Sequence, residues 1–69
     1  MDIKLAKVWF QEEEHRILAT VRFSEQQPSG AVNSATTEVF LDWIDSYDEI
    51  KRQAIERAKA FLLHAASDR

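Results

Sequence analysis

Two groups of side chains could do chemistry in this chain, and the first is a short acidic run that ends in a histidine. Glu12, Glu13 and Glu14 stand directly before His15. Carboxylates and imidazoles both ligate divalent metals. Neighbours in a short loop seldom converge on one ion, however, so we interpret this run as a solvated turn and expect no metal site.

The second group is the acidic stretch between residues 42 and 49. It lacks the Asp-x-Asp-x-Asp-Gly spacing of a calcium loop, although hard cations prefer such oxygen ligands. Negative charge is favourable at the N-terminus of a helix, and this role explains three of the four acidic residues in the stretch. The alternative is a contact surface for a basic partner. The members are Asp42, Asp45, Asp48 and Glu49.

The composition argues against an enzyme. One Gly excludes a glycine-rich phosphate loop, and the absence of Cys excludes thiolate zinc sites and disulfides. His15 has no partner at a spacing typical of a catalytic triad, and His64 suits the C-terminal part of a helix. A chain of 69 residues leaves little room for a substrate pocket. We therefore expect no catalytic residues, no cofactor and no small-molecule substrate.

The segments that must position these side chains are three strands and one helix. Apolar and polar residues alternate over about 3–10, 15–23 and 36–44, which is typical of strands. Ser46 and Glu49 form a capping box before a helical pattern over about 47–66. The polar segment between strands two and three, Ser24–Ala35, is expected to be the longest loop, with a turn at its Pro-Ser-Gly.

These elements predict an α+β fold in one domain over residues 1–69: a three-stranded antiparallel meander, then one long C-terminal helix packed on one sheet face. The order β-β-β-α is similar to that of the truncated double-stranded-RNA-binding-like domain of HicB-type antitoxins. That likeness covers element order only, and it carries over no residue. The helix face expected to meet the sheet consists of Tyr47, Ile50, Ala54, Ile55, Ala58, Phe61, Leu62 and Ala65.

The sheet has more apolar residues than one helix can cover. A sheet under one helical layer should have one polar face, yet Val8, Phe10, Leu18 and Phe40 are expected on the face turned away from the helix. An apolar patch of that size marks an interaction surface. The alternative is a β-bulge in the first strand that turns Val8 or Phe10 inward.

The preferred hypothesis is a small, non-enzymatic protein-interaction module, with an inhibitor, antitoxin, immunity or phage-type accessory role. Its apolar sheet face would bind a second copy or a target protein. Such small cores often need a partner for stability. Its acidic corner, Asp42 to Glu49, would steer the chain toward a basic partner, and Asp42 and Asp45 are the contact residues expected there.

The rival hypothesis is nucleic-acid binding by the first hairpin. Arg16 and Arg22 would contact phosphates, with Lys4 and Lys7 nearby, while Phe10 and Phe40 stack on bases. The formal charge of −3 disfavours it, because electrostatic footprints on nucleic acid are usually basic. No apolar run is long enough for a membrane span, and we expect a cytoplasmic protein.

Overall fold

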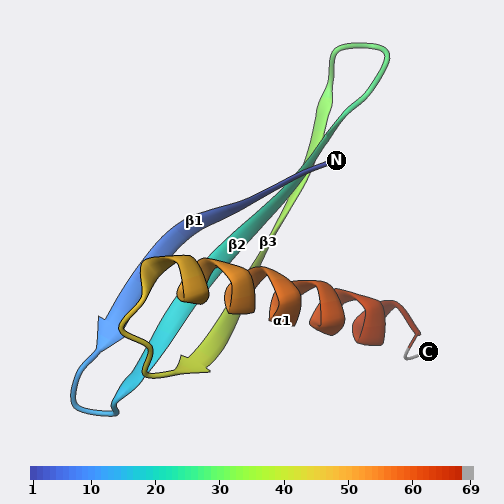
Figure 1. The fold of residues 1–69 in the computed structure, drawn as a ribbon. Coiled ribbons are helices and arrows are strands. Elements are labelled where there is room, and N and C mark those ends of the chain that lie inside the picture. The colour runs from blue at the N-terminus through green and yellow to red at the C-terminus, as the bar shows by residue number, and fades with distance from the viewer. Residues whose placement is uncertain (68–69) are drawn as a thin grey trace.

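Three strands and one helix account for most of the residues described in the computed structural model, which are 1–67. They are β1 (Asp2–Gln11), β2 (Arg16–Gln26), β3 (Val32–Asp42) and α1 (Tyr47–Ser67). The strands pair antiparallel in the order β1-β2-β3, and α1 lies across one face of the sheet (Figure 1). The α+β meander with a C-terminal helix is confirmed. The described helix is not long and apolar enough to cross a membrane.

The hairpin of β2 and β3 is longer than the sequence predicts. Pairing runs without a shift from Arg16 opposite Asp42 to Gln26 opposite Val32. The predicted loop Ser24–Ala35 is therefore wrong at both ends, and the strand predicted over 36–44 lies at 32–42 instead. The added pairs are mostly polar on both faces, so backbone hydrogen bonds hold them together rather than an apolar side.

The tip of this hairpin is the turn that Pro28 and Gly30 predict. The Gly30 N–H donates to the Gln27 carbonyl at 2.9 Å, and the Gln27 N–H donates to the Ala31 carbonyl at 2.7 Å. Gly30 has φ 93°, a left-handed conformation that a side chain would strain. The pattern is a three-residue loop with Gly at the left-handed position, as in many hairpins.

A bulge in β1 decides which side chains face the helix. The pairing with β2 shifts by one residue between Leu5 and Lys7, so Ala6 is the extra residue. Before it, Ile3 and Leu5 pair with inward-facing residues of β2; after it, Val8 does so too. The sequence left the inward parity of this strand open, and the bulge resolves it by changing the parity halfway.

The core lies between α1 and the odd-numbered residues of β2 and β3. Its fully enclosed helix residues are Ile50, Ala54 and Ala58. Small residues at two of these positions let the helix approach the sheet closely. Phe61 and Tyr47, which the helical period predicts to face the core, are exposed. The sheet residues of the core are Ile17, Ala19, Val21, Phe23, Val39 and Leu41.

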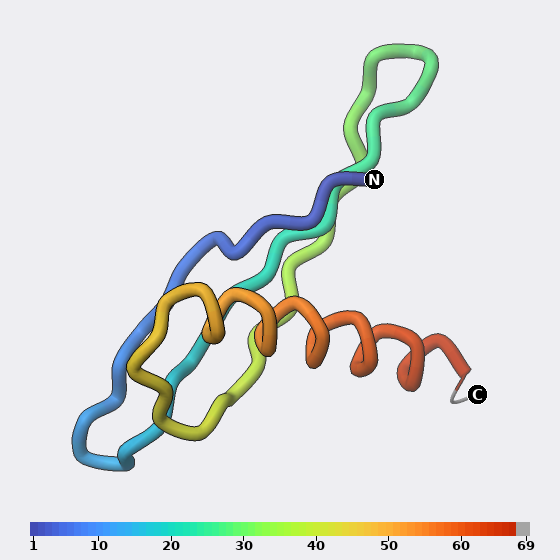
Figure 2. Tube along the Cα trace, in the orientation of Figure 1, coloured from blue at the N-terminus to red at the C-terminus, as the bar shows by residue number. Residues whose placement is uncertain are grey.

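The helix begins at its predicted cap and extends beyond the sheet. The Glu49 N–H donates to Ser46 Oγ at 3.3 Å, which confirms one half of the capping box. The Glu49 side chain binds Arg52 and Gln53 instead of completing the other half. The tube trace shows α1 crossing β3 and continuing past it, and it shows the β2–β3 hairpin projecting beyond the N-terminus of β1 (Figure 2). The molecule is elongated, at 45 × 28 × 17 Å.

Candidate interaction surface

The face of the sheet turned away from α1, here called the outer face, carries an apolar row across all three strands. Trp9 pairs with Leu18, and Leu18 pairs with Phe40. Trp9 is 56% exposed and Phe40 is 51% exposed, while Leu18 between them is partly buried. Neighbours in one register row lie within contact distance, so the three side chains form one continuous surface, the aromatic row.

Two of the four predicted patch residues lie elsewhere. The structure places Leu18 and Phe40 on the outer face as predicted, but the placement of Val8 and Phe10 beside them is wrong. Val8 packs against the core because the bulge at Ala6 reverses the parity of the rest of β1. Phe10 also turns to the helix side, where its ring meets that of Trp43 edge-on at 5.4 Å.

Trp9 is the outer-face residue that sequence reasoning missed. The alternation in β1 has apolar residues at both parities, and a bulge was the alternative left open. The sequence signal that locates the bulge is a change in the alternation: the apolar residues Ile3 and Leu5 have odd numbers, whereas Val8 and Phe10 have even numbers. A one-residue insertion between the two pairs lets all four face inward and sends Trp9 outward.

Charges of both signs surround the aromatic row, and they are sorted by strand. The bulge brings Lys4 and Lys7 of β1 to the same face, since without it their different parities would separate them. Lys4 pairs with Arg22 of β2, and on the opposite edge of the sheet β3 carries Glu38 and Asp42. Asp2, at the start of β1, is also on this face, so the outer face is mainly basic along β1 and β2 and acidic along β3.

A small hollow of about 170 Å³ lies within this face. Trp9 and Leu18 line it together with Lys7, Thr20 and Glu38. An apolar wall with one cation and one anion suits a side chain with an apolar body and a polar end. Its volume is well below the several hundred Å³ typical of substrate pockets.

Arg16 is held over the aromatic row. Its guanidinium carbon lies 4.4 Å from the centroid of the Phe40 ring, and its Nε donates to Gln11 Oε1 at 2.6 Å. A cation over an aromatic face is stabilised by the ring quadrupole. This contact orients Phe40 and places a positive charge at the end of the row.

The two contact residues predicted in the acidic corner, Asp42 and Asp45, have different surroundings. Asp42 ends β3 on the outer face, where it pairs in register with Arg16. Asp45 lies in the connection to α1, and its Oδ1 accepts a hydrogen bond from Trp43 Nε1 at 3.1 Å. Asp42 is therefore part of the outer face, whereas Asp45 supports the packing of Trp43.

The glutamate run and its histidine form the turn between β1 and β2. The His15 N–H donates to the Glu12 carbonyl at 3.2 Å, and His15 adopts φ 53°. Its ring stacks on Trp43 with centroids 4.9 Å apart. Within residues 1–67 no group of three His, Asp or Glu side chains is placed to hold a metal ion. The run lies in an exposed turn, as predicted.

The strongest charge interaction lies on the solvent side of α1. Arg52 forms a salt bridge with Glu49 and donates to both carboxylate oxygens of Glu56 at 3.0 Å. The hydrogen bond from Arg52, with a second from Gln53, lowers the pKa of Glu49 to about 2. The pKa of Arg52 is raised by the same contact. All these groups are exposed, so this cluster stabilises the helix locally.

Comparison with known proteins adds no family: no family model matches the chain, and neither a curated protein nor a solved structure matches it.

Proposed function

We propose that this chain is a small, non-enzymatic protein-interaction module that binds a partner protein through its outer face. The observation that carries the proposal is the aromatic row of Trp9, Leu18 and Phe40, which crosses the whole width of the sheet. Aromatic residues bury large areas with little loss of side-chain freedom and are enriched at the centres of interfaces.

The charges around the row define the chemistry of the partner. The partner contributes a side chain with an apolar body and a polar end, which covers the hollow between Trp9 and Thr20. Its acidic groups meet Lys4 and Lys7, and its basic groups meet Glu38 and Asp42 on the other edge. Such a pattern fixes the orientation of the partner and increases the rate of association more than the affinity.

The test compares two aromatic residues in different places. Phe40→Asp introduces a charge into the row, whereas Tyr47→Asp changes an equally exposed aromatic at the start of α1. Both immobilised variants and the wild type are exposed to extracts of the native host, and the retained proteins are identified by mass spectrometry. We expect Phe40→Asp to lose a protein that the wild type and Tyr47→Asp retain. Identical sets of proteins on all three would refute the proposal.

Nucleic-acid binding is the second candidate, and the bulge favours it. The bulge brings Lys4 and Lys7 to the face that already carries Arg16 and Arg22, and these cations could contact phosphates. The same face exposes Trp9 and Phe40, whose rings could stack on bases. The acidic groups of β3 on the same face oppose it.

A charge reversal distinguishes the two candidates. If the outer face binds nucleic acid, wild-type protein shifts fluorescent single-stranded RNA or DNA at low salt, the affinity falls steeply with salt, and Lys4→Glu with Arg22→Glu abolishes the shift. The absence of any shift at low salt would exclude this candidate and leave the protein partner.

A further inference from the structure

We infer that two copies of this chain pair through the exposed edge of β3, joining their sheets into one six-stranded sheet beneath both helices. This inference goes beyond the proposed function because it uses a different surface and leaves the outer face of each sheet accessible. Three features carry it: the contrast between the two sheet edges, the overhang of α1, and the surface area of the isolated chain.

The two edge strands differ in how well they resist pairing. Edge strands in natural proteins are protected by bulges, by lysines and by proline. β1 has a bulge at Ala6 and two lysines, Lys4 and Lys7. β3 is eleven residues long, contains neither Lys nor Pro, and pairs with β2 without a register shift. The edge of β3 is therefore the regular one, and it can accept another strand.

The hydrogen-bond pattern identifies which residues of β3 face outward. Because the Gln27 N–H donates to Ala31, the odd-numbered residues of β3 direct their backbone groups to β2. The even-numbered residues, Ser34, Thr36, Glu38 and Phe40 among them, direct theirs to the edge. Arg57 Nη1 donates to the Phe40 carbonyl at 3.1 Å, so the helix itself reaches this edge.

Beyond that contact, α1 continues past β3 (Figure 1), and Leu62 is the last residue of the described helix that packs against the core of its own chain. Ala58 is its last enclosed residue, and of the next positions on the same helix face Leu62 is partly buried while Phe61 is 58% exposed. A helix of 21 residues is about 31 Å long, whereas three strands are only about 10 Å apart from first to last. The helix is long enough to cover strands of a second sheet.

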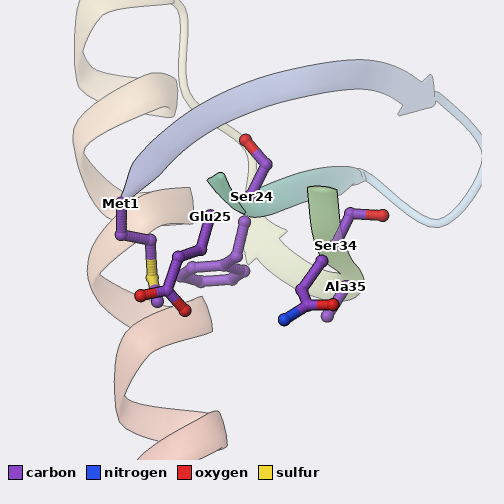
Figure 3. A pocket seen from close by; sticks show the side chains of 7 residues that line it. Met1, Ser24, Glu25, Ser34 and Ala35 are labelled. Carbon is purple, nitrogen blue, oxygen red and sulfur yellow. The ribbon is translucent and has the colours of Figure 1, made fainter. Parts of the chain in front are cut away.

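A two-fold axis perpendicular to the sheet, midway between Thr37 and Thr37 of the partner subunit, matches these surfaces. It sets Val39 beside Ala35 of the partner subunit on the helix side, and Glu38 beside Thr36 of the partner subunit on the outer face. Ala35 is exposed in the isolated chain and lines a hollow of about 180 Å³ with Met1 and Phe23 (Figure 3). Each overhanging helix then covers apolar surface of the other sheet.

The area of the isolated chain agrees with what a stable dimer needs. Its accessible surface is 5290 Å², whereas a compact monomer of this mass exposes about 4,500 Å². The excess of about 800 Å² is close to what each partner buries in a standard interface. The radius of gyration is 13.5 Å, against about 11 Å for a compact chain of this length.

The first test is the mass in solution, measured by sedimentation equilibrium with two matched helix variants. Wild-type protein should have about twice the chain mass of 8.0 kDa. Phe61→Glu places a charge on the overhanging inner face and should raise the dissociation constant about thirtyfold or more. Leu63, 71% exposed, lies on the opposite side of the helix, so Leu63→Glu should leave the dimer unchanged.

The second test removes one hydrogen bond of the edge. Thr36→Pro deletes an N–H that points away from β2, which edge strands tolerate, and should also weaken the dimer; Thr36→Val keeps that N–H and serves as the control. Trp9→Asp changes the aromatic row on β1, the strand farthest from this edge, and should lose the partner protein but leave the mass unchanged, so failure of this inference and failure of the proposed function are distinguishable. A monomeric wild type, or a dimer unaffected by both Phe61→Glu and Thr36→Pro, would overturn the inference.

Discussion

Replacing Ile50 by alanine removes the largest enclosed side chain that α1 contributes to the core. Ile50 is 1% exposed and belongs to the cluster of Ile17 and Leu41. Deleting three buried carbons costs about 2.4 kcal/mol in transfer free energy, and the remaining cavity raises the loss to about 3–4 kcal/mol. A single core of this size supplies only about 3–5 kcal/mol, so the substitution removes most of the stability of an isolated chain.

Urea unfolding followed by far-ultraviolet circular dichroism measures this loss. The Ile50→Ala midpoint should fall close to zero urea at low protein concentration and rise with concentration, because dimerisation stabilises only the folded state. Lys51→Ala, an exposed neighbour, should change the stability by no more than about 0.5 kcal/mol. A midpoint for Ile50→Ala within error of the wild type would refute the assignment of the helix to this core.

Three further predictions concern the turn, the bulge and the helix. Gly30→Ala should destabilise the hairpin by about 1–2 kcal/mol in urea unfolding, because φ is 93°, a conformation that L side chains rarely adopt. The added Cβ meets no atom within 4 Å, so backbone strain alone causes the loss. An unchanged midpoint would contradict the left-handed turn. Deleting Ala6 should remove the bulge and leave Ile3, Leu5 and Val8 facing the core, because the remaining residues of β1 then alternate without a break, so the NMR contacts of Leu5 with Val21 and of Val8 with Ala19 should persist; loss of either contact would contradict the bulge at Ala6. The pKa of Glu49 is lowered to about 2, so its stabilising contact with Arg52 should be present above pH 4.5 and be lost as the pH falls to 2. Glu49→Gln should flatten that part of the pH–stability curve, and an identical acid limb in both proteins would argue against the contact.

The sequence predicts the order of elements because each element depends on local patterns. Alternation identifies β2 from residues such as Ile17, Val21 and Phe23, and Ser46 locates the start of α1. The predicted loop Ser24–Ala35 was too long for the opposite reason, since both of its ends belong to β2 and β3. Its residues are mostly polar, and a ladder of backbone hydrogen bonds leaves no pattern in the side chains.

The outer face could be predicted only in part. Leu18 and Phe40 follow from the alternation of their strands, but Val8, Phe10 and Trp9 depend on one inserted residue, Ala6. A bulge changes the parity of everything that follows it, so a one-residue uncertainty exchanges the two faces.

Longer-range features carry no local signal. The helical period predicts that Phe61 lies on the helix face that meets the sheet. It cannot show that the sheet is too narrow to cover Phe61, which is exposed. The contact of Arg57 with the Phe40 carbonyl and the stacking of His15 on Trp43 depend on how distant segments meet. These contacts become visible only when the helix and the sheet are placed together.

Amide hydrogen exchange along β3, resolved by NMR for individual residues, reports directly on whether two chains pair through this edge. If two chains pair through this edge, the outward N–H groups of Thr36 and Glu38 should exchange as slowly as the inward N–H groups of Thr37 and Val39 at concentrations where the dimer forms. In the Phe61→Glu variant only the outward pair should become fast. Fast exchange at Thr36 and Glu38 in the concentrated wild-type protein would contradict the account.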